Sequence, residues 1–359
     1  MTGEIATQKG QLARYAAKRV QSRVDKPVKE FRGELALVEG IRRRAERLPA
    51  QAAVRVGIGD DCAILRLRAG EELAVTTDLS LEGRHFRQDW HPAEAVGHRA
   101  LARGLSDLAA MGARPISAFL SLAVPAELTK AGRGGRASWM DRFLDGMLAL
   151  AAVHGVPLAG GDISESPIAV ADIVLTGAVP RGQALLRSGA RPGDRICVTG
   201  RLGAAAVELS ELERSPKRFR GLTSFAAGHA HLYPEPRLAQ GVKLRELASA
   251  GMDLSDGLSV DLARLCRASG VAAVVDAGKL PLAAGATVEQ ALNGGEDYEL
   301  LVTIPAGVRV PRQVAGVALT VVGEVVAAAP GRPVVTLVEG GVTRPLESDG
   351  WQHFTGTKR

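Results

Sequence analysis

The stretch GMDLSDGLSVDLARL, residues 251–265, places two aspartates on either side of Ser255 where a helix is expected to begin. A Ser or Asp oxygen at a helix start can accept a hydrogen bond from a backbone N–H of the first turn. One such cap does not require both Asp253 and Asp256, whose i, i+3 spacing brings two negative charges to one side of a turn. Two interpretations stay open: a solvated terminus with two capping residues, or carboxylates that share a cation.

Strand and helix patterns alternate around this stretch. In the second half of the chain we expect a helix after Gly203, a helix that begins at a proline, and strands in DRICVTG (194–200), VAAVVD (271–276) and GGEDYELLVTI (294–304). In the first half we expect helices at 33–47, 92–111 and through 147–153, and strands at 72–78, 116–124 and 168–179. Such alternation predicts an α/β or α+β fold.

The predicted domain organisation is two lobes behind an N-terminal extension. The segment PRGQALLRSGARPGD, residues 180–194, is rich in Gly, Pro and Arg and is interpreted as the lobe boundary. We therefore expect an extension at 1–32, a first lobe at 33–180 and a second lobe at 181–359. A length of 359 residues with 46% hydrophobic residues is sufficient for two such cores.

The net charge of +6 is concentrated in the N-terminal extension. Residues 1–32 hold eight lysines and arginines against three acidic residues, so the remaining body is nearly neutral. A transit-like or RNA-tethering arm is one interpretation, and a flexible or loosely helical extension is the favoured one. A nucleic-acid partner is therefore not expected for the body of the protein.

Cysteine usage and hydropathy exclude several classes of protein. Cys62, Cys197 and Cys266 are far apart and form no CxxC pair, which indicates a reducing compartment and favours the cytoplasm. No uncharged apolar run reaches the roughly 20 residues needed to cross a bilayer. The paired His229 and His231 are interpreted as part of an exposed loop.

Aspartates beside glycine or other small residues are the unusual feature of the sequence. Each is expected at a turn or at the end of an element, where a single aspartate is usually a cap. Several of them together provide the hard oxygen ligands that Mg²⁺ prefers. The set is Asp60, Asp61, Asp78, Asp107, Asp162, Asp253 and Asp256. The familiar GxxxxGK[ST], GxGxxG, HRD, DFG, HExxH and GxSxG signatures are absent.

Seven short motifs stand in an order that resembles the thiamine-monophosphate kinase family, within the aminoimidazole ribonucleotide synthetase-like superfamily. They are GIGDDCAIL, TTDLSLEGRHF, LSDLAAMGARP, GGD, LLRSGARPGD, DLSDGLSVDL and GGEDYEL, and the likeness runs from about Gly33 to Phe354. The resemblance implies a two-lobed fold and a homodimer whose first lobes form the interface. It also implies Mg²⁺-dependent phosphorylation of thiamine monophosphate to thiamine diphosphate by ATP, through direct in-line transfer.

The resemblance also implies roles for single residues. Metal contacts are expected from Asp61, Thr76, Thr77, Asp78, Asp107, Asp162, Asp253 and Asp256, and catalytic roles from Asp78, Asp107 and Arg187. ATP contacts are expected from Gly161, Asp162, Arg187 and Ser255, and acceptor contacts from His85, Glu296 and Trp351. Plainer roles stay open for some of them: a surface arginine for Arg187, a helix cap for Ser255, a core histidine for His85 and a lid over a core edge for Trp351.

This sequence departs from the usual family pattern near several of these positions. TTDLSLEGRHF lacks the usual run after its aspartate, GLSD has glycine where asparagine is frequent, and GGDISES replaces a threonine pair. These changes put the acceptor geometry in doubt. The alternatives are another ATP-dependent enzyme of the superfamily that acts on a different small molecule, or a non-catalytic nucleotide-binding protein.

Overall fold

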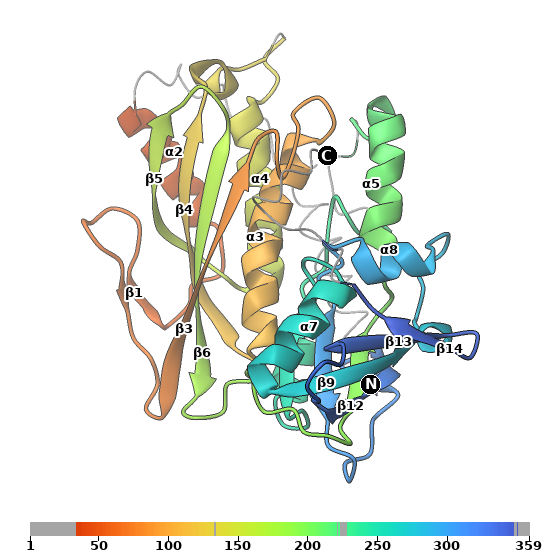
Figure 1. The fold of residues 1–359 in the computed structure, drawn as a ribbon. Coiled ribbons are helices and arrows are strands. Elements are labelled where there is room, and N and C mark those ends of the chain that lie inside the picture. The colour runs from red at the N-terminus through yellow and green to blue at the C-terminus, as the bar shows by residue number, and fades with distance from the viewer. Residues whose placement is uncertain (1–33, 133, 221, 223–227, 348–349, 351–359) are drawn as a thin grey trace.

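The computed structural model describes residues 34–132, 134–220, 222, 228–347 and 350. In this part of the chain two lobes lie side by side, each built on its own sheet (Figure 1). The expected two-lobed fold of mixed helices and strands is therefore confirmed. The described helices include none that is both long and apolar enough to cross a membrane.

The sheet of the first lobe has the strand order β3-β6-β4-β5. Neighbours are antiparallel except β4 and β5, which run parallel and are connected through α4. The strands of this sheet are β3 (Glu71–Leu81), β4 (Arg114–Val124), β5 (Leu158–Glu165) and β6 (Val170–Pro180). The smaller elements before it are α2 (Glu34–Ala45), β1 (Val54–Val56) and β2 (Ile64–Leu65), and η1 (Ala126–Thr129) follows β4.

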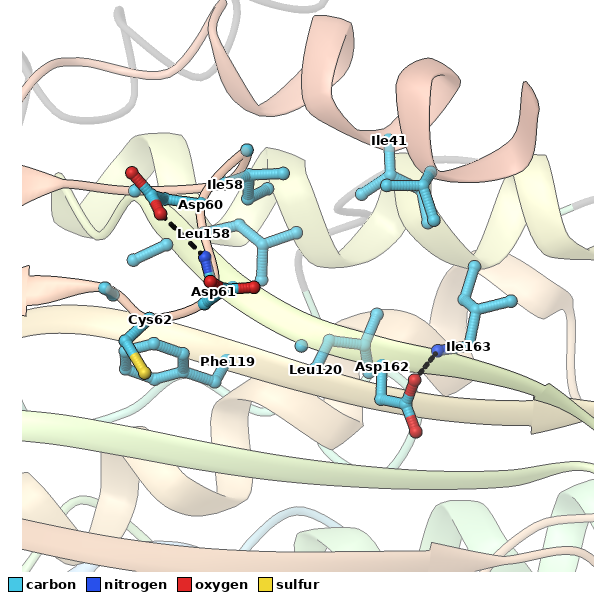
Figure 2. Close-up of a pocket in the computed structure, with 17 residues that line it drawn as sticks. Ile41, Ile58, Asp60, Asp61, Cys62, Phe119, Leu120, Leu158, Asp162 and Ile163 are labelled. Atoms are coloured by element: carbon cyan, nitrogen blue, oxygen red, sulfur yellow. Dashed lines mark hydrogen bonds between the residues drawn. The ribbon is translucent and has the colours of Figure 1, made fainter. Parts of the chain in front are cut away.

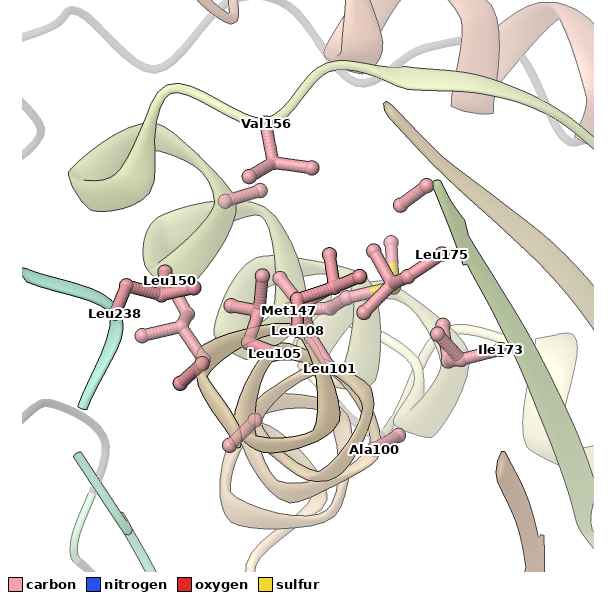
Figure 3. Packing of buried hydrophobic residues seen from close by; sticks show 14 of the residues in the cluster. Ala100, Leu101, Leu105, Leu108, Met147, Leu150, Val156, Ile173, Leu175 and Leu238 are labelled. Atoms are coloured by element: carbon pink, nitrogen blue, oxygen red, sulfur yellow. The ribbon is translucent and has the colours of Figure 1, made fainter. Parts of the chain in front are cut away.

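Two long helices, α3 (Ala93–Ala110) and α4 (Trp139–His154), cover one face of this sheet. The stripe of Leu101, Leu105 and Leu108 on α3 is at most 1% exposed and packs between Met147 of α4 and the sheet (Figure 3). The two helices approach closely at Gly97, where an added Cβ would lie 1.9 Å from the carbonyl oxygen of Phe143. Apolar burial and this close crossing hold α3 firmly in place.

The second lobe is built on a sheet with the main strand order β14-β13-β9-β12-β7-β10-β8. Its strands are β7 (Arg195–Thr199), β8 (Ala250–Asp253), β9 (Val271–Asp276), β10 (Leu300–Ile304), β11 (Gln313–Val314), β12 (Val317–Ala327), β13 (Val335–Glu339) and β14 (Val342–Pro345). Its helices are α5 (Ala204–Arg214), η2 (Pro216–Arg218), α6 (Leu238–Leu244), α7 (Leu258–Ser269), η3 (Ala277–Lys279) and α8 (Val288–Asn293).

The two lobes meet along α3. Apolar residues of both lobes belong to one buried cluster, in which Leu238 and Leu244 of α6 join the leucines of α3. Arg245 donates a hydrogen bond to the carbonyl oxygen of Gly112, which follows α3 in a left-handed conformation with φ 63°. The helix that carries Asp107 is therefore fixed against both halves of the molecule.

Three expectations about local structure are wrong. Asp78 and Asp162 lie inside strands rather than at element ends, and the strand that holds Asp162, β5, was not expected. The register of four paired strands, not local turn chemistry, decides these positions. His231 is 3% exposed instead of lying in an exposed loop, because the segment around it packs against α3.

The helix-cap interpretation of the opening stretch is also wrong. Helix α7 begins after Gly257, which supplies no side-chain cap. The carboxylate that receives backbone N–H groups here is Asp261, whose Oδ2 accepts from Ser255 at 3.1 Å and from Asp256 at 3.0 Å. Asp253 and Asp256 are therefore available for other contacts.

Candidate functional site

The face of β3 toward α3 carries Thr76 and Asp78, because side chains alternate along a strand. Thr76 donates a hydrogen bond to Asp107 Oδ2, which joins the strand to the helix. Asp78 Oδ1 lies 3.1 Å from the Nη2 of Arg103, one turn before Asp107 on α3. These side chains form the first-lobe half of a cluster that we call the inner-face site.

The second lobe adds Asp253 to the inner-face site. This residue ends β8, is 4% exposed, and accepts a hydrogen bond from the Ser106 hydroxyl at 2.7 Å. The negative charges of Asp107 and Asp78 are close enough to disfavour the ionisation of Asp253. The three aspartates thus converge from a strand, a helix and a second sheet.

Burial decides the ionisation of these carboxyl groups. Loss of water around Asp253, reinforced by the charge of Asp107, raises its pKa to about 8. Burial raises the pKa of Asp78 to about 6, although Arg103 opposes the change. The pKa of Asp107 is also raised by burial, against the hydrogen bond from Thr76 and the nearby Arg187. Carboxylates that repel one another in a dry site are suited to receive a cation.

The loop after β8 has its own charge balance. Asp256 pairs with Arg264 of α7, and that guanidinium also lies 2.9 Å from Asp261 Oδ1. Asp256 therefore has a protein cation beside it, whereas Asp253 faces the aspartates of the first lobe. The two aspartates of the opening stretch do not share one partner in this structure.

A second group of expected residues lies on the opposite face of the first-lobe sheet. Asp78 is in register with Ile173, Leu120 and Gly161 across the four strands, so Asp162 points to the other side. Thr77 is on this outer face as well and is exposed. The expected metal residues are thus divided between two faces.

The outer face contains a pocket of about 570 Å³ between α2, the 57–63 loop and strands β4 and β5 (Figure 2). Its walls include Ile41, Ile58 and Phe119, and its acidic residues are Asp60, Asp61 and Asp162. At Gly161 an added Cβ would lie 1.9 Å from the Leu120 carbonyl oxygen, so only glycine fits there. An apolar pocket with acidic groups is suited to a flat base that carries a metal-bound phosphate chain.

Among the expected acceptor residues, Glu296 of the second lobe lies against α3 of the first lobe. Glu296 has a left-handed backbone conformation with φ 57°. Its Oε1 accepts a hydrogen bond from Arg99 Nη2 at 2.6 Å, and its Oε2 lies 3.0 Å from His231 Nδ1. Burial alone would raise its pKa, but Arg99, His231 and Arg103 hold that pKa well below its usual range. His85 accepts the backbone N–H of Leu81 at 3.0 Å, and Trp351 lies outside the described residues.

Comparison with known proteins identifies the family. Residues 59–182 match the AIR synthase related protein, N-terminal domain, and residues 191–335 match its C-terminal domain. The thiamine-monophosphate kinase of Salmonella typhimurium is 38% identical over 336 residues, which cover 90% of this chain and 98% of that protein. The chain belongs to the thiamine-monophosphate kinase family.

Solved structures agree with this membership of the kinase family. The thiamine-monophosphate kinase of Stenotrophomonas maltophilia is 35% identical, with a TM-score of 0.69 over 86% of this chain and 96% of that one. AaThiL complexed with AMPPCP and TMP is 30% identical, with a TM-score of 0.66 over 92% of this chain and 100% of that one. The likeness therefore extends over both lobes.

Three residues near the site were not identified as functional candidates from the sequence. Asp261 stands at the end of the DLSDGLSVD motif and organises the loop that carries Ser255 and Asp256. Arg103 and Arg99 lie on the α3 face toward the site. The one available signal was the i, i+4 spacing of Arg103 and Asp107, which is typical of a helix ion pair.

The residues of the inner-face site fit a Mg²⁺ ion without forming a complete cage. Among the residues that the structure describes, no three His, Cys, Asp or Glu side chains are grouped tightly enough to enclose a metal. Mg²⁺ is usually bound by one or two carboxylates together with substrate phosphates and waters. Asp78 and Asp107, with the hydroxyl of Thr76 between strand and helix, are donors of that type.

Proposed function

We propose that this protein transfers the γ-phosphoryl group of ATP to the phosphate of thiamine monophosphate and so forms thiamine diphosphate. The observation that carries the proposal is the match with a named thiamine-monophosphate kinase over 98% of that protein's length. The complex of AaThiL with AMPPCP and TMP supports the same pair of ligands for a chain of this fold.

The reaction needs no covalent enzyme intermediate. An oxygen of the acceptor phosphate forms a bond to the γ-phosphorus, the bond from that phosphorus to the β,γ-bridging oxygen breaks, and ADP leaves with the electron pair. The acceptor is already an anion at neutral pH, so it needs no general base. The main barrier is the meeting of negatively charged groups, which cationic side chains and metal ions lower.

The inner-face site would hold Mg²⁺ ions, with Asp78 and Asp107 as ligands from the first lobe and Asp253 as a ligand from the second lobe. The bound metal would neutralise phosphate oxygens during the transfer. Arg187, whose charge opposes the rise in the pKa of Asp107, would bind phosphate oxygens of ATP together with the hydroxyl of Ser255. The carboxylates would hold the metal, and the arginine would offset the negative charge that remains on the phosphates.

We assign the adenosine of ATP to the outer-face pocket and the thiazolium of the acceptor to the neighbourhood of Glu296. Ile41, Ile58 and Phe119 offer apolar contact to a purine, while Asp61 and Asp162 would bind Mg²⁺ at the phosphates. Glu296 keeps its negative charge despite burial, which suits a cationic ring. His85 and Trp351 are proposed as further acceptor contacts.

A homodimer would bring the two faces of the site together. Strands β3 and β5 are the two edges of the first-lobe sheet, so three strand spacings separate Asp78 from Asp162, about 14 Å in total. Leu73, Val75 and Leu79 on the outer face of β3 are each about half exposed, as expected of a surface that a partner covers. We propose that the β3 edge of one protomer meets the β5 edge of its partner.

The three cysteines support a reducing compartment, and we propose the cytoplasm as the location. Cys197 and Cys266 are buried, Cys62 is exposed, and all three are unpaired. An unpaired exposed thiol is stable in a reducing environment and is uncommon in an oxidising one.

One incubation tests the reaction and the substrate together. Purified protein is mixed with ATP, Mg²⁺ and thiamine monophosphate, and the product is identified by mass. Thiamine diphosphate and ADP in equal amounts are expected, with none formed when Mg²⁺ is chelated. If ATP is consumed only with a different phosphorylated or carboxylated acceptor from a substrate panel, the proposed substrate is wrong.

A further inference from the structure

Arg103 of α3 lies against strand β3 in the first-lobe half of the inner-face site. Its side chain is 17% exposed, and Nη2 lies 3.1 Å from Asp78 Oδ1. Nη1 donates to the carbonyl oxygen of Leu79 at 3.2 Å and lies 3.4 Å from Ser80 Oγ. The guanidinium is thus held against β3 by one carboxylate and by two weaker contacts.

The charges around Arg103 come from both expected subsites. Asp78 and Asp107 are expected metal ligands, Glu296 is an expected acceptor residue, and Tyr298 lies two residues after it; all four interact electrostatically with this guanidinium. One cation therefore interacts both with the carboxylates that would hold the metal and with the carboxylate that would contact the acceptor. Negative charge would accumulate there if two phosphates met.

Arg103 and a metal ion would compete for the same carboxylate. Among the residues that the structure describes, Arg103 is the cation that pairs with Asp78. A divalent ion on Asp78 weakens the attraction for the guanidinium and repels it. Because the arginine side chain is long, its head group can then leave Asp78 while its stem stays packed on α3.

We propose that Arg103 is a phosphate-contacting residue that neutralises Asp78 before metal binds and turns to the phosphate oxygens between donor and acceptor afterwards. The identity of those phosphates rests on the proposed function. The pairing of Arg103 with Asp78 is independent of that function. A planar guanidinium with several N–H donors can bridge oxygens of two phosphates at once.

The test combines metal binding with kinetics on the full-length protein. Mn²⁺ is titrated without nucleotide, and free Mn²⁺ is followed by electron paramagnetic resonance. Arg103→Gln is expected to bind Mn²⁺ at least about threefold more tightly than the parent protein, because a competing cation is lost. Its kcat with ATP and thiamine monophosphate is expected to fall about 10-fold to 100-fold.

Two further variants separate this role from a structural one. Arg103→Lys keeps the charge and should restore the Mn²⁺ affinity of the parent while recovering only part of kcat. Arg114→Gln removes an ion pair with Glu71 on the same lobe and should change neither quantity. Circular dichroism confirms that each variant is folded.

In Arg103→Gln, the affinity for Mn²⁺ must rise and kcat must fall. Mn²⁺ affinity that is equal or weaker in Arg103→Gln, or turnover that is unchanged, overturns the proposal. Weaker metal binding together with lower turnover would indicate a merely structural residue. If the parent protein forms no thiamine diphosphate, the proposed function fails, and the Mn²⁺ comparison still decides whether Arg103 competes for Asp78.

Discussion

Single side chains on the inner face show how burial prepares a charged site. Asp78 and Asp253 have raised pKa values because water is excluded from them and because other carboxylates lie nearby. Glu296 differs from them because Arg99 and His231 hold it ionised. Buried carboxyl groups therefore differ with their neighbours: those of Asp78 and Asp253 have raised pKa values, whereas that of Glu296 keeps its negative charge.

Asp78→Asn tests the metal role of the first strand. Asparagine is similar in size but neutral, so it cannot offset the charge of a divalent ion. We expect turnover with saturating Mg²⁺ to fall about 100-fold or more. Asp89→Asn, at an exposed aspartate paired with Arg87, is the control and should keep full activity. Turnover close to that of the parent protein would reject the metal role of Asp78.

Glu296→Gln tests the acceptor side. The amide keeps a hydrogen-bond acceptor for Arg99 but removes the negative charge that would face the thiazolium ring. We expect the KM for thiamine monophosphate to rise about tenfold, with the KM for ATP unchanged. The comparison is Glu235→Gln, an exposed carboxylate, which should leave both constants as they are. An equal rise in both KM values would contradict a contact specific to the acceptor.

At the scale of elements, helix α3 connects the two lobes and carries Asp107. Glycines permit its close contacts on two sides: Gly97 against α4, and Gly241 of α6 against the Ala109 carbonyl oxygen, where an added Cβ would lie 1.9 Å away. Small residues at these crossings let the backbones approach more closely than a side chain would allow. The position of Asp107 relative to Asp253 depends on both crossings.

Gly97→Ala tests the crossing of α3 and α4. Its methyl group would lie 1.9 Å from the Phe143 carbonyl oxygen, so the helices must move apart. We expect the free energy of unfolding, measured with urea, to fall by at least about 2 kcal/mol. Gly307→Ala, where nothing lies within 4 Å of the added Cβ, should change it little. Equal stability of the two variants would show that the crossing is adaptable.

His98 couples α3 to the second lobe in a way that depends on pH. It is 2% exposed, its Nε2 donates to the Pro234 carbonyl oxygen at 2.8 Å, and burial lowers its pKa to about 3. Below a pH of about 6.5, His98 binds a proton in the unfolded chain but stays neutral in the folded protein. This histidine therefore lowers the free energy of unfolding as the pH falls.

The variant His98→Gln removes that titration. We expect the free energy of unfolding of the parent protein, relative to His98→Gln, to fall by about 2 kcal/mol between pH 7.5 and pH 5. Urea unfolding at a series of pH values measures the difference. A difference that is constant, or that grows as the pH falls, would mean that His98 is charged in the folded protein.

At the scale of the whole molecule, the proposed dimer depends on the outer face of β3. Val75→Glu places a charge in the middle of the apolar patch formed with Leu73 and Leu79, all of which are about half exposed. We expect light scattering to show a monomer, with activity reduced at least about tenfold, because Asp78 and Asp162 would no longer be brought together. A Val75→Glu dimer with full activity would place the interface elsewhere.

The control for the dimer is Val342→Glu on β14 of the second lobe. Val342 is 66% exposed, and the strand that carries it, β14, lies on the side of the second lobe away from the first-lobe sheet (Figure 1). This variant should remain dimeric and active. A monomer produced by both substitutions would indicate a general loss of solubility or folding instead of a defined interface.

Much of the fold was predictable from the sequence because it depends on local patterns. The leucine stripe of α3, the glycine after it and the alternating strands all follow from the spacing of apolar residues along the chain. The strand β5 was not predictable, since LAGGDISE has neither an apolar run nor clear alternation, and it becomes a strand through pairing with β4.

The sequence by itself determined which residue types are available: oxygen ligands for a metal in five of seven short motifs, and no signature of another nucleotide fold. Only the tertiary structure decided how they are distributed. Strand register places Thr76 and Asp78 on one face of the sheet and Thr77 and Asp162 on the other, and the docking of α3 against β8 brings Ser106 to Asp253. Register and docking depend on contacts between residues far apart in the chain, so no local pattern contains them.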